Sequence, residues 1–269
     1  MNLQCGIKAC PKMNNTPSHV HQDAQGFLGF LWNWSFQEWQ SLLFFSNIKE
    51  QKDSQEENVW IVVKDNLVAV LKIFREIWIL ELFVISMAQG MVQSFMIGDM
   101  TKNFATCAFG IQYIGYVIMC SGLGNCLAAL TVHTLIEKIG IFIIIMTSWA
   151  CASTIMICFF FWNVASSHPA VLLVINILFA MAEGALTSQV HGYYGVIFFE
   201  RKAAAFATFS ISRSIGNTIS FAYGNSVCVV TKVVILLLVN FIGICFFYHV
   251  YYDNQRLKKK KIIQALQPS

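Results

Sequence analysis

The sequence predicts an all-α membrane protein, a six-helix transmembrane bundle, on the basis of two observations. Of its 269 residues, 57% are hydrophobic and 12% are charged, whereas about a quarter of the residues in soluble domains are charged. Six long apolar stretches also follow one another after residue 72, with short polar segments between them. At about 1.5 Å per residue, each is long enough as a helix to cross a hydrocarbon core of about 30 Å.

The chain is predicted to comprise a leader, a linker, a membrane domain and a tail. Residues 1–48 hold a polar leader and an aromatic interfacial or degenerate helix, and residues 49–72 form a charged cytosolic linker. The membrane domain covers 73–252, and a basic cytosolic tail covers 253–269. A polar loop is expected after the first span, over residues 98–106. The predicted spans are about 77–98, 110–133, 140–161, 170–191, 203–223 and 233–252.

The aromatic stretch at 27–45 contains three tryptophans, Trp32, Trp34 and Trp39, beside polar residues. Tryptophan among polar neighbours is typical of the headgroup level, which favours an interfacial helix, with a seventh membrane span as the alternative. The cysteines and histidines of the leader lack the spacing of a zinc site, so no metal is predicted.

Lysine and arginine predict the orientation of the bundle. If the linker and the tail are cytosolic, most lysines and arginines of the membrane domain and its flanks lie on the cytosolic side. Lys102 and Lys232 are the two that lie on the opposite side. The positive-inside rule therefore places the linker, the tail and the leader in the cytosol. A span at 27–45 would instead move the first 26 residues outside. The membrane is a plasma membrane or an endomembrane, and the sequence does not distinguish them.

The second predicted span carries a stripe of small residues, Gly115, Gly122, Cys126 and Ala129. Their spacings of seven, four and three residues place them on one face of a helix. Small residues let a neighbouring helix approach closely in lipid, so this face is predicted to pack against another helix.

Polar residues form stripes on the first and fourth predicted spans. In a bilayer such stripes face protein or water. Glu183 in the fourth span and Arg213 in the fifth lie at similar depths. An unpaired charge at such a depth costs at least about 2.5–3.5 kcal/mol. We therefore predict an intramembrane charge pair that holds or switches a cleft, with a static structural pair or two separately hydrated groups as the alternatives. The candidate cleft-lining residues are Ser86, Gln89, Gln93, Asn176, Thr187 and His191.

Three motifs carry a family resemblance: GDMTKNFATCAFGIQYIGYV at 98–117, MAEGALTSQVHGYYGVIFFERKAAAFA at 181–207 and FAYGNSVCVV at 221–230. With them, the membrane domain resembles the C-terminal six-helix half of the uncoordinated-93 (UNC-93-like) family of ion-channel regulatory proteins, which have the major facilitator superfamily fold. The resemblance implies that the helices correspond to spans seven to twelve and that the first and fourth face a central cleft. Some family members regulate potassium channels or escort receptors.

The chain departs from the family pattern at three positions. Relatives have a glutamate at the position of Val92, an arginine at that of Ser210 and a glutamate at that of Arg213. A family site built on those charges is therefore not expected here. Cys107 and Cys228 lie in family-like motifs at the outer ends of helices, in an oxidising compartment, and are a candidate disulfide.

The basic tail is expected to act at the membrane surface. The run Lys258, Lys259, Lys260 and Lys261 follows the last span. It is predicted to stop transfer and to contact anionic lipid of the inner leaflet, at about 1 kcal/mol per lysine.

No residue pattern points to a catalytic site, so no enzyme activity or cofactor is predicted, and nucleic acid is not an expected partner. The resemblance implies a polytopic regulatory or trafficking subunit of an ion channel or receptor. A small-solute, proton-coupled or uncoupled transporter of the facilitator type is an alternative, and a partial gene product without independent function is another. The predicted partners are membrane lipids and another membrane protein, either a channel or receptor or a second copy of the chain.

Overall fold

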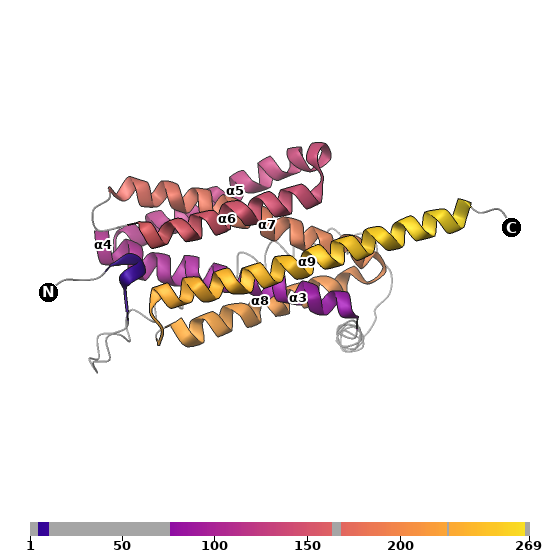
Figure 1. Cartoon of the computed structure of the whole chain (residues 1–269). Coiled ribbons are helices and arrows are strands. Elements are labelled where there is room, and N and C mark those ends of the chain that lie inside the picture. The colour runs from indigo at the N-terminus through magenta and orange to yellow at the C-terminus, as the bar shows by residue number, and fades with distance from the viewer. Residues whose placement is uncertain (1–4, 11–75, 163–167, 225, 267–269) are drawn as a thin grey trace, which may run out of the picture. The chain divides into compact units, whose positions relative to one another are not determined.

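The computed structural model describes residues 5–10, 76–162, 168–224 and 226–266. The described part is built from helices without a strand (Figure 1). The predictions made for the remainder of the leader, for the stretch at 27–45 and for the charged linker lie outside the described residues.

The first membrane helix is longer than its sequence predicts. It begins as α3 (Ile77–Ser94), continues as the π-helical segment η2 (Phe95–Thr106) and ends with α4 (Cys107–Phe109). The predicted polar loop over 98–106 is therefore wrong, because this segment is helical. Gly110 then reverses the chain at a φ of 100°, a conformation that glycine adopts without steric cost.

Five further helices follow, close to the predicted spans. Gly140, with a positive φ of 88°, lies between the first two of them. A short 3-10 turn, η4 (Phe199–Arg201), leads into α8. The five are α5 (Tyr113–Ile139), α6 (Ile141–Phe161), α7 (Pro169–Ile197), α8 (Lys202–Gly224) and α9 (Val229–Leu266).

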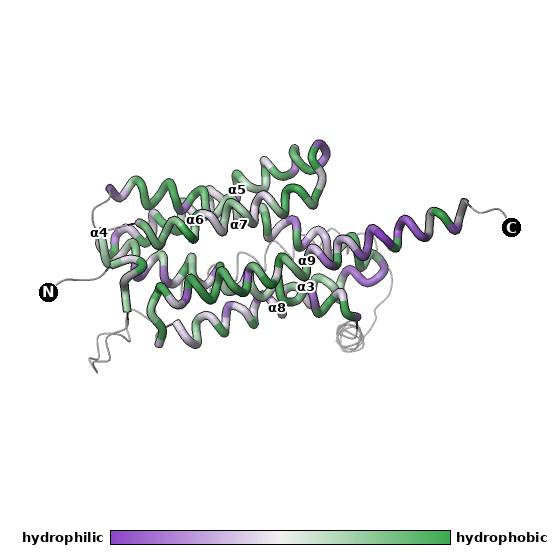
Figure 2. Tube along the Cα trace, viewed as in Figure 1, coloured by the Kyte–Doolittle hydropathy of each residue, from purple (hydrophilic) through white to green (hydrophobic). Residues whose placement is uncertain are grey.

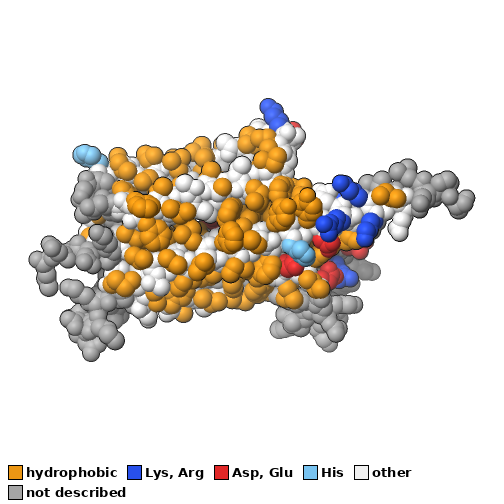
Figure 3. Space-filling model, in the orientation of Figure 1, with side chains coloured by type: hydrophobic (Ala, Val, Ile, Leu, Met, Phe, Trp, Pro, Cys, Tyr) orange, Lys and Arg blue, Asp and Glu red, His pale blue; other side chains and the backbone are white. Residues whose placement is uncertain are grey.

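The composition of these helices confirms a multi-pass membrane protein. Within the described residues, five helices are long and apolar enough to cross a membrane, the first being the continuous helix Ile77–Phe109. The remaining long helix, α8, carries serine, threonine, asparagine and arginine along its length, which lowers its hydropathy. Apolar residues dominate the middle of the bundle, and polar residues gather on the C-terminal part of α9 (Figure 2). The visible face is correspondingly covered by apolar side chains (Figure 3).

The helices pack as two groups of three. One group consists of α7 with α5 and α6, and the other of α3 with α8 and α9. The first core cluster, near α4, contains Phe95, Phe104, Phe159 and Phe179, and their rings contact one another at centroid distances of 5.3 to 6.4 Å. A second cluster at the other end of α3 includes Tyr194 and residues of α8 and α9. Both clusters draw on the two groups, so they join the bundle into one packed unit.

Candidate functional site

Two glycines bring α3 and α8 into backbone contact at the centre of the bundle. A Cβ atom on Gly90 of α3 would overlap the carbonyl oxygen of Arg213 on α8. Reciprocally, a Cβ atom on Gly216 of α8 would overlap the carbonyl oxygen of Met87 on α3. Close approach through glycine is a common way to hold helices together in lipid, where apolar side chains gain little by leaving the solvent.

This contact places Arg213 beside polar groups of α3 and α7. The Arg213 Nε–H donates a hydrogen bond of 2.9 Å to Oε1 of Gln93 on α3. Arg213 also interacts electrostatically with Glu183 of α7, which is 8% exposed. Gln89, one turn before Gln93, is fully buried. The three helices thus share one polar centre, which we define as Gln89, Gln93, Glu183, Thr187 and Arg213.

Several atoms of this polar centre have no hydrogen-bond partner among the described residues. They are Oε1 of Glu183 and both side-chain polar atoms of Gln89, whereas the Thr187 hydroxyl interacts with the Glu183 carboxylate. A buried polar atom without a partner costs about 1–3 kcal/mol, so a water, an ion or a ligand group at this centre would be stabilised by them. The centre is therefore the best-supported candidate site of the described part.

The predicted charge pair is not in direct contact. Among the described residues the Glu183 carboxylate makes no direct ion pair, whereas Glu76 and Asp99 do. The Arg213 Nε–H donates its hydrogen bond to Oε1 of Gln93 and not to the Glu183 carboxylate. The charge pair of Glu183 and Arg213 therefore stays a prediction, and the electrostatic interaction between the two side chains supports it.

We expect Glu183→Gln to lower the folded fraction, because it removes the negative charge that compensates Arg213, and arginine does not deprotonate in proteins. The double variant Glu183→Gln/Arg213→Gln should recover much of the loss. The measurement is the monodisperse fraction after extraction in mild detergent. Glu137→Gln at the exposed end of α5 is the control. Equal losses in the single and double variants would contradict the coupling.

Two other predicted cleft residues, Ser86 and Asn176, instead form hydrogen bonds between helices. The Ser86 hydroxyl shares a hydrogen bond of 3.0 Å with the Tyr194 hydroxyl, between α3 and α7. The Asn176 amide donates to the Val117 carbonyl at 2.7 Å and to Ser121 Oγ at 2.9 Å, between α7 and α5. Ser86 and Asn176 are fully buried.

His191 is also enclosed by side chains of the neighbouring helix. Its ring lies 4.6 Å, between centroids, from each of Phe206 and Phe209 on α8. The proposed cleft-lining role therefore concentrates on Gln89, Gln93 and Thr187.

The small-residue stripe of α5 is exposed, which corrects the predicted packing face. Cβ atoms on Gly115 and Gly122 would meet nothing within 4 Å, and Cys126 and Ala129 are exposed. The face that packs on α7 carries Val117, Gly124, Ala128 and Val132. Gly124 is its closest point, because a Cβ there would lie 2.5 Å from the Ile177 carbonyl oxygen.

A buried ion pair joins η2 to the beginning of α9 at one end of the bundle. Lys232 Nζ of α9 lies 2.7 Å from Oδ1 of Asp99 in η2, and the two side chains are 5% and 13% exposed. The Asn103 amide donates to the same oxygen at 2.7 Å. The sequence placed Lys232 on the non-cytosolic side but did not predict its pairing with Asp99, although each is a charged residue at the end of an apolar span.

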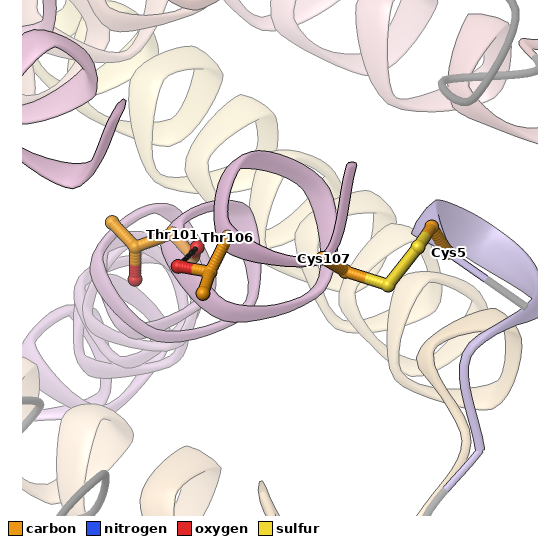
Figure 4. The surroundings of a disulfide bond; sticks show 4 residues. All are labelled: Cys5, Thr101, Thr106 and Cys107. Carbon is orange, nitrogen blue, oxygen red and sulfur yellow. Dashed lines mark hydrogen bonds between the residues drawn. A yellow bond between two sulfur atoms is a disulfide. The ribbon is translucent and has the colours of Figure 1, made fainter. Parts of the chain in front are cut away.

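Two disulfides lie at this same end, and the predicted pairing of Cys107 with Cys228 is wrong. Cys107 is bonded to Cys5 (Figure 4), and Cys228 is bonded to Cys10. Both partners come from the leader, which the sequence placed in the cytosol. Beside Cys107, the Thr106 hydroxyl donates to the Thr101 carbonyl at 2.7 Å, which helps to hold the end of η2 (Figure 4).

At the end of the bundle away from the disulfides, polar contacts hold the beginning of α3 against α9. Glu76, just before α3, also pairs with Arg201 in the α7–α8 turn. The Trp78 indole N–H donates to Asp253 at 3.1 Å, and His249 Nδ1 lies 2.9 Å from Glu81. The α9 helix continues beyond these contacts through the basic run to Leu266. Lys258, Lys259 and Lys260 are exposed there, as the predicted lipid contact requires.

No group of His, Cys, Asp or Glu in the described ranges is arranged to hold a metal ion. The polar centre contains one carboxylate, an arginine and amides, a set suited to hydrogen bonding and to binding polar or charged groups.

Comparison with known proteins identifies relatives over the membrane domain. The chain is 30% identical over 192 residues to the zebrafish protein unc-93 homolog A. This alignment covers 71% of this chain and 41% of the relative. It is 32% identical over 179 residues to unc-93 homolog A of Xenopus laevis, covering 66% of this chain and 39% of the relative. It is 24% identical over 179 residues to the "putative potassium channel regulatory protein unc-93" of Caenorhabditis elegans, covering 66% of this chain and 25% of the relative.

These relatives confirm the UNC-93 resemblance. The chain spans about two fifths of the length of the unc-93 homolog A proteins from zebrafish and Xenopus. No family model matches the chain, and no solved structure matches it. The correspondence to one half of a facilitator fold therefore stays a prediction.

Proposed function

We propose that this UNC-93-like membrane protein acts as a regulatory or trafficking subunit of an ion channel or receptor. The observation that carries the proposal is the similarity, over 66% of the chain, to the worm "putative potassium channel regulatory protein unc-93". A potassium channel is accordingly the first partner to examine.

The packing of the bundle is consistent with a binding role. Ser86 and Asn176, which would line a transport pathway in the alternative function, are engaged in contacts between helices. Much of α5 is exposed, including Met119 at 72% and Leu130 at 69%. Exposed apolar side chains on a membrane helix suit contact with lipid or with another membrane protein.

The unpartnered polar atoms of Gln89 and Glu183 favour a second candidate, a small-solute transporter. Transporters of this kind bind their substrates near the bilayer midplane, between two structural repeats. The polar centre would then supply one wall of the substrate site, and a second copy or another protein would supply the other.

We expect co-expression of the chain with a potassium channel to change the channel current or its surface density without uptake of solute. The measurement combines whole-cell recording, surface biotinylation of the channel and uptake of a panel of labelled small solutes. A chain with Gly216→Leu, which should not pack correctly, is the control for effects of membrane-protein load.

An altered current that persists with the control variant would argue against a specific subunit role. Uptake that depends on Glu183, with no effect on current or delivery, would replace the subunit function with transport.

A further inference from the structure

The N-terminal turn η1 (Gly6–Lys8) lies between the two disulfide-bonded cysteines of the leader. Cys5 bonds to Cys107, immediately after η2, and Cys10 bonds to Cys228, immediately before α9. The Val229 N–H donates a hydrogen bond of 3.1 Å to the Ala9 carbonyl. Ile7 is 5% exposed and belongs to the core cluster near α4. The turn is thus bound covalently and by packing to the outer end of the bundle.

The chain re-enters the described structure at the opposite end. Glu76, next to the beginning of α3, pairs with Arg201 at 3.1 Å, and Trp78 bonds to Asp253 far along α9. Between these contacts and the disulfides runs the continuous helix Ile77–Phe109, of 33 residues. At about 1.5 Å per residue such a helix is about 50 Å long, more than the hydrocarbon thickness of about 30 Å. Cys10 and Ile77 therefore lie on opposite sides of any membrane that the bundle spans.

We propose that the chain crosses the membrane once more between Cys10 and Ile77, and that two disulfides hold its N-terminal turn on the non-cytosolic face. The apolar stretch at 27–45 is the crossing segment that the sequence offers. The linker and the basic tail then keep their predicted cytosolic place, and the leader moves outside. This inference does not depend on the proposed function.

The side of the membrane also follows from the chemistry of the cysteines. Each disulfide forms when two thiols give up two electrons and two protons to the disulfide of a thiol oxidoreductase, which is reduced to a dithiol. Such bonds persist in the secretory compartments and outside the cell and are rare in the cytosol. The basic residues of the bundle favour the opposite end as the cytosolic one, so both arguments give the same orientation.

Cleavage of the linker tests the covalent attachment. A specific protease site is inserted after Lys52, and an epitope tag is placed before Met1. Membranes from cells treated with N-ethylmaleimide, which blocks free thiols, are solubilised, cleaved and run on denaturing gels without reductant. We expect the tagged fragment to migrate with the membrane domain and to separate on reduction.

Single and double cysteine variants make this test specific. Cys5→Ser or Cys10→Ser alone should leave the fragment attached through the other bond, whereas the double variant should release it without reductant. Cys126→Ser, at an exposed free cysteine of α5, is the matched control and should behave as the unmodified chain. Release of the fragment from the unmodified chain without reductant would overturn the proposal.

Protease protection in sealed microsomes tests the topology separately. With one tag before Met1 and another after Ser269, the N-terminal tag should be protected and the C-terminal tag digested. Digestion of both tags would place the leader in the cytosol and overturn the additional crossing.

Discussion

Gly216→Ala is expected to lower the free energy of unfolding by about 1–3 kcal/mol, and Gly216→Leu by more. The added Cβ would overlap the Met87 carbonyl oxygen and lie 2.9 Å from the carbonyl carbon. Both are helix backbone atoms, which do not rotate away as a side chain does. The axes of α3 and α8 would have to separate, and Arg213 would lose its position beside Gln93.

Thermal loss of monodisperse protein in detergent measures this effect. Gly122→Ala is the matched control, because a Cβ on this glycine of α5 meets nothing within 4 Å. Gly90→Ala should resemble Gly216→Ala, and the double variant should lose less than the sum, since separated axes remove both overlaps. Equal stability of Gly216→Ala and Gly122→Ala would contradict the close contact.

The apolar length of the chain predicts the spans well but not how far the helices extend. Helix α6, Ile141–Phe161, agrees with the predicted span at 140–161 within one residue at its beginning. Helix α9, predicted to end at 252, continues to Leu266, because the lysine-rich sequence is a good helix former whether or not it lies in lipid. A hydropathy pattern indicates which residues lie in the membrane. It does not indicate whether the helix continues past the membrane surface.

Tertiary contacts explain the other differences. The segment at 98–106 has the polar residues of a loop, yet it stays helical where Lys232, distant in sequence, neutralises Asp99. On α5 two faces carry small residues, and the one with Gly124 and Ala128 packs on α7. The sequence identified Cys107 and Cys228 as candidates for oxidation, but the cytosolic assignment of the leader removed Cys5 and Cys10 from consideration.

Removal of one partner of the Asp99–Lys232 ion pair should be among the most destabilising single substitutions in the described part of the chain. Lys232→Met would leave the Asp99 carboxylate buried without its ion-pair partner, although Asn103 would still donate a hydrogen bond to it and Lys102 would still attract it electrostatically. Breaking one side of a buried pair costs about 3–5 kcal/mol, so we expect a large loss of folded, detergent-extractable protein and a lower thermal midpoint. Asp99→Asn should be as damaging, because it leaves a buried ammonium group without a counter-charge.

The double variant and a matched exposed pair separate the loss of attraction from the cost of an unpaired charge. Asp99→Asn/Lys232→Met buries no net charge, so it should regain most of the stability, as replaced buried ion pairs often do. Arg201 and Glu76 form the control pair, since their side chains are 48% and 45% exposed. Arg201→Met should cost no more than about 1 kcal/mol, the usual limit for exposed pairs. If Lys232→Met were as mild as Arg201→Met, the outer end of the bundle would be open to water, and the ion pair would not explain why η2 remains helical.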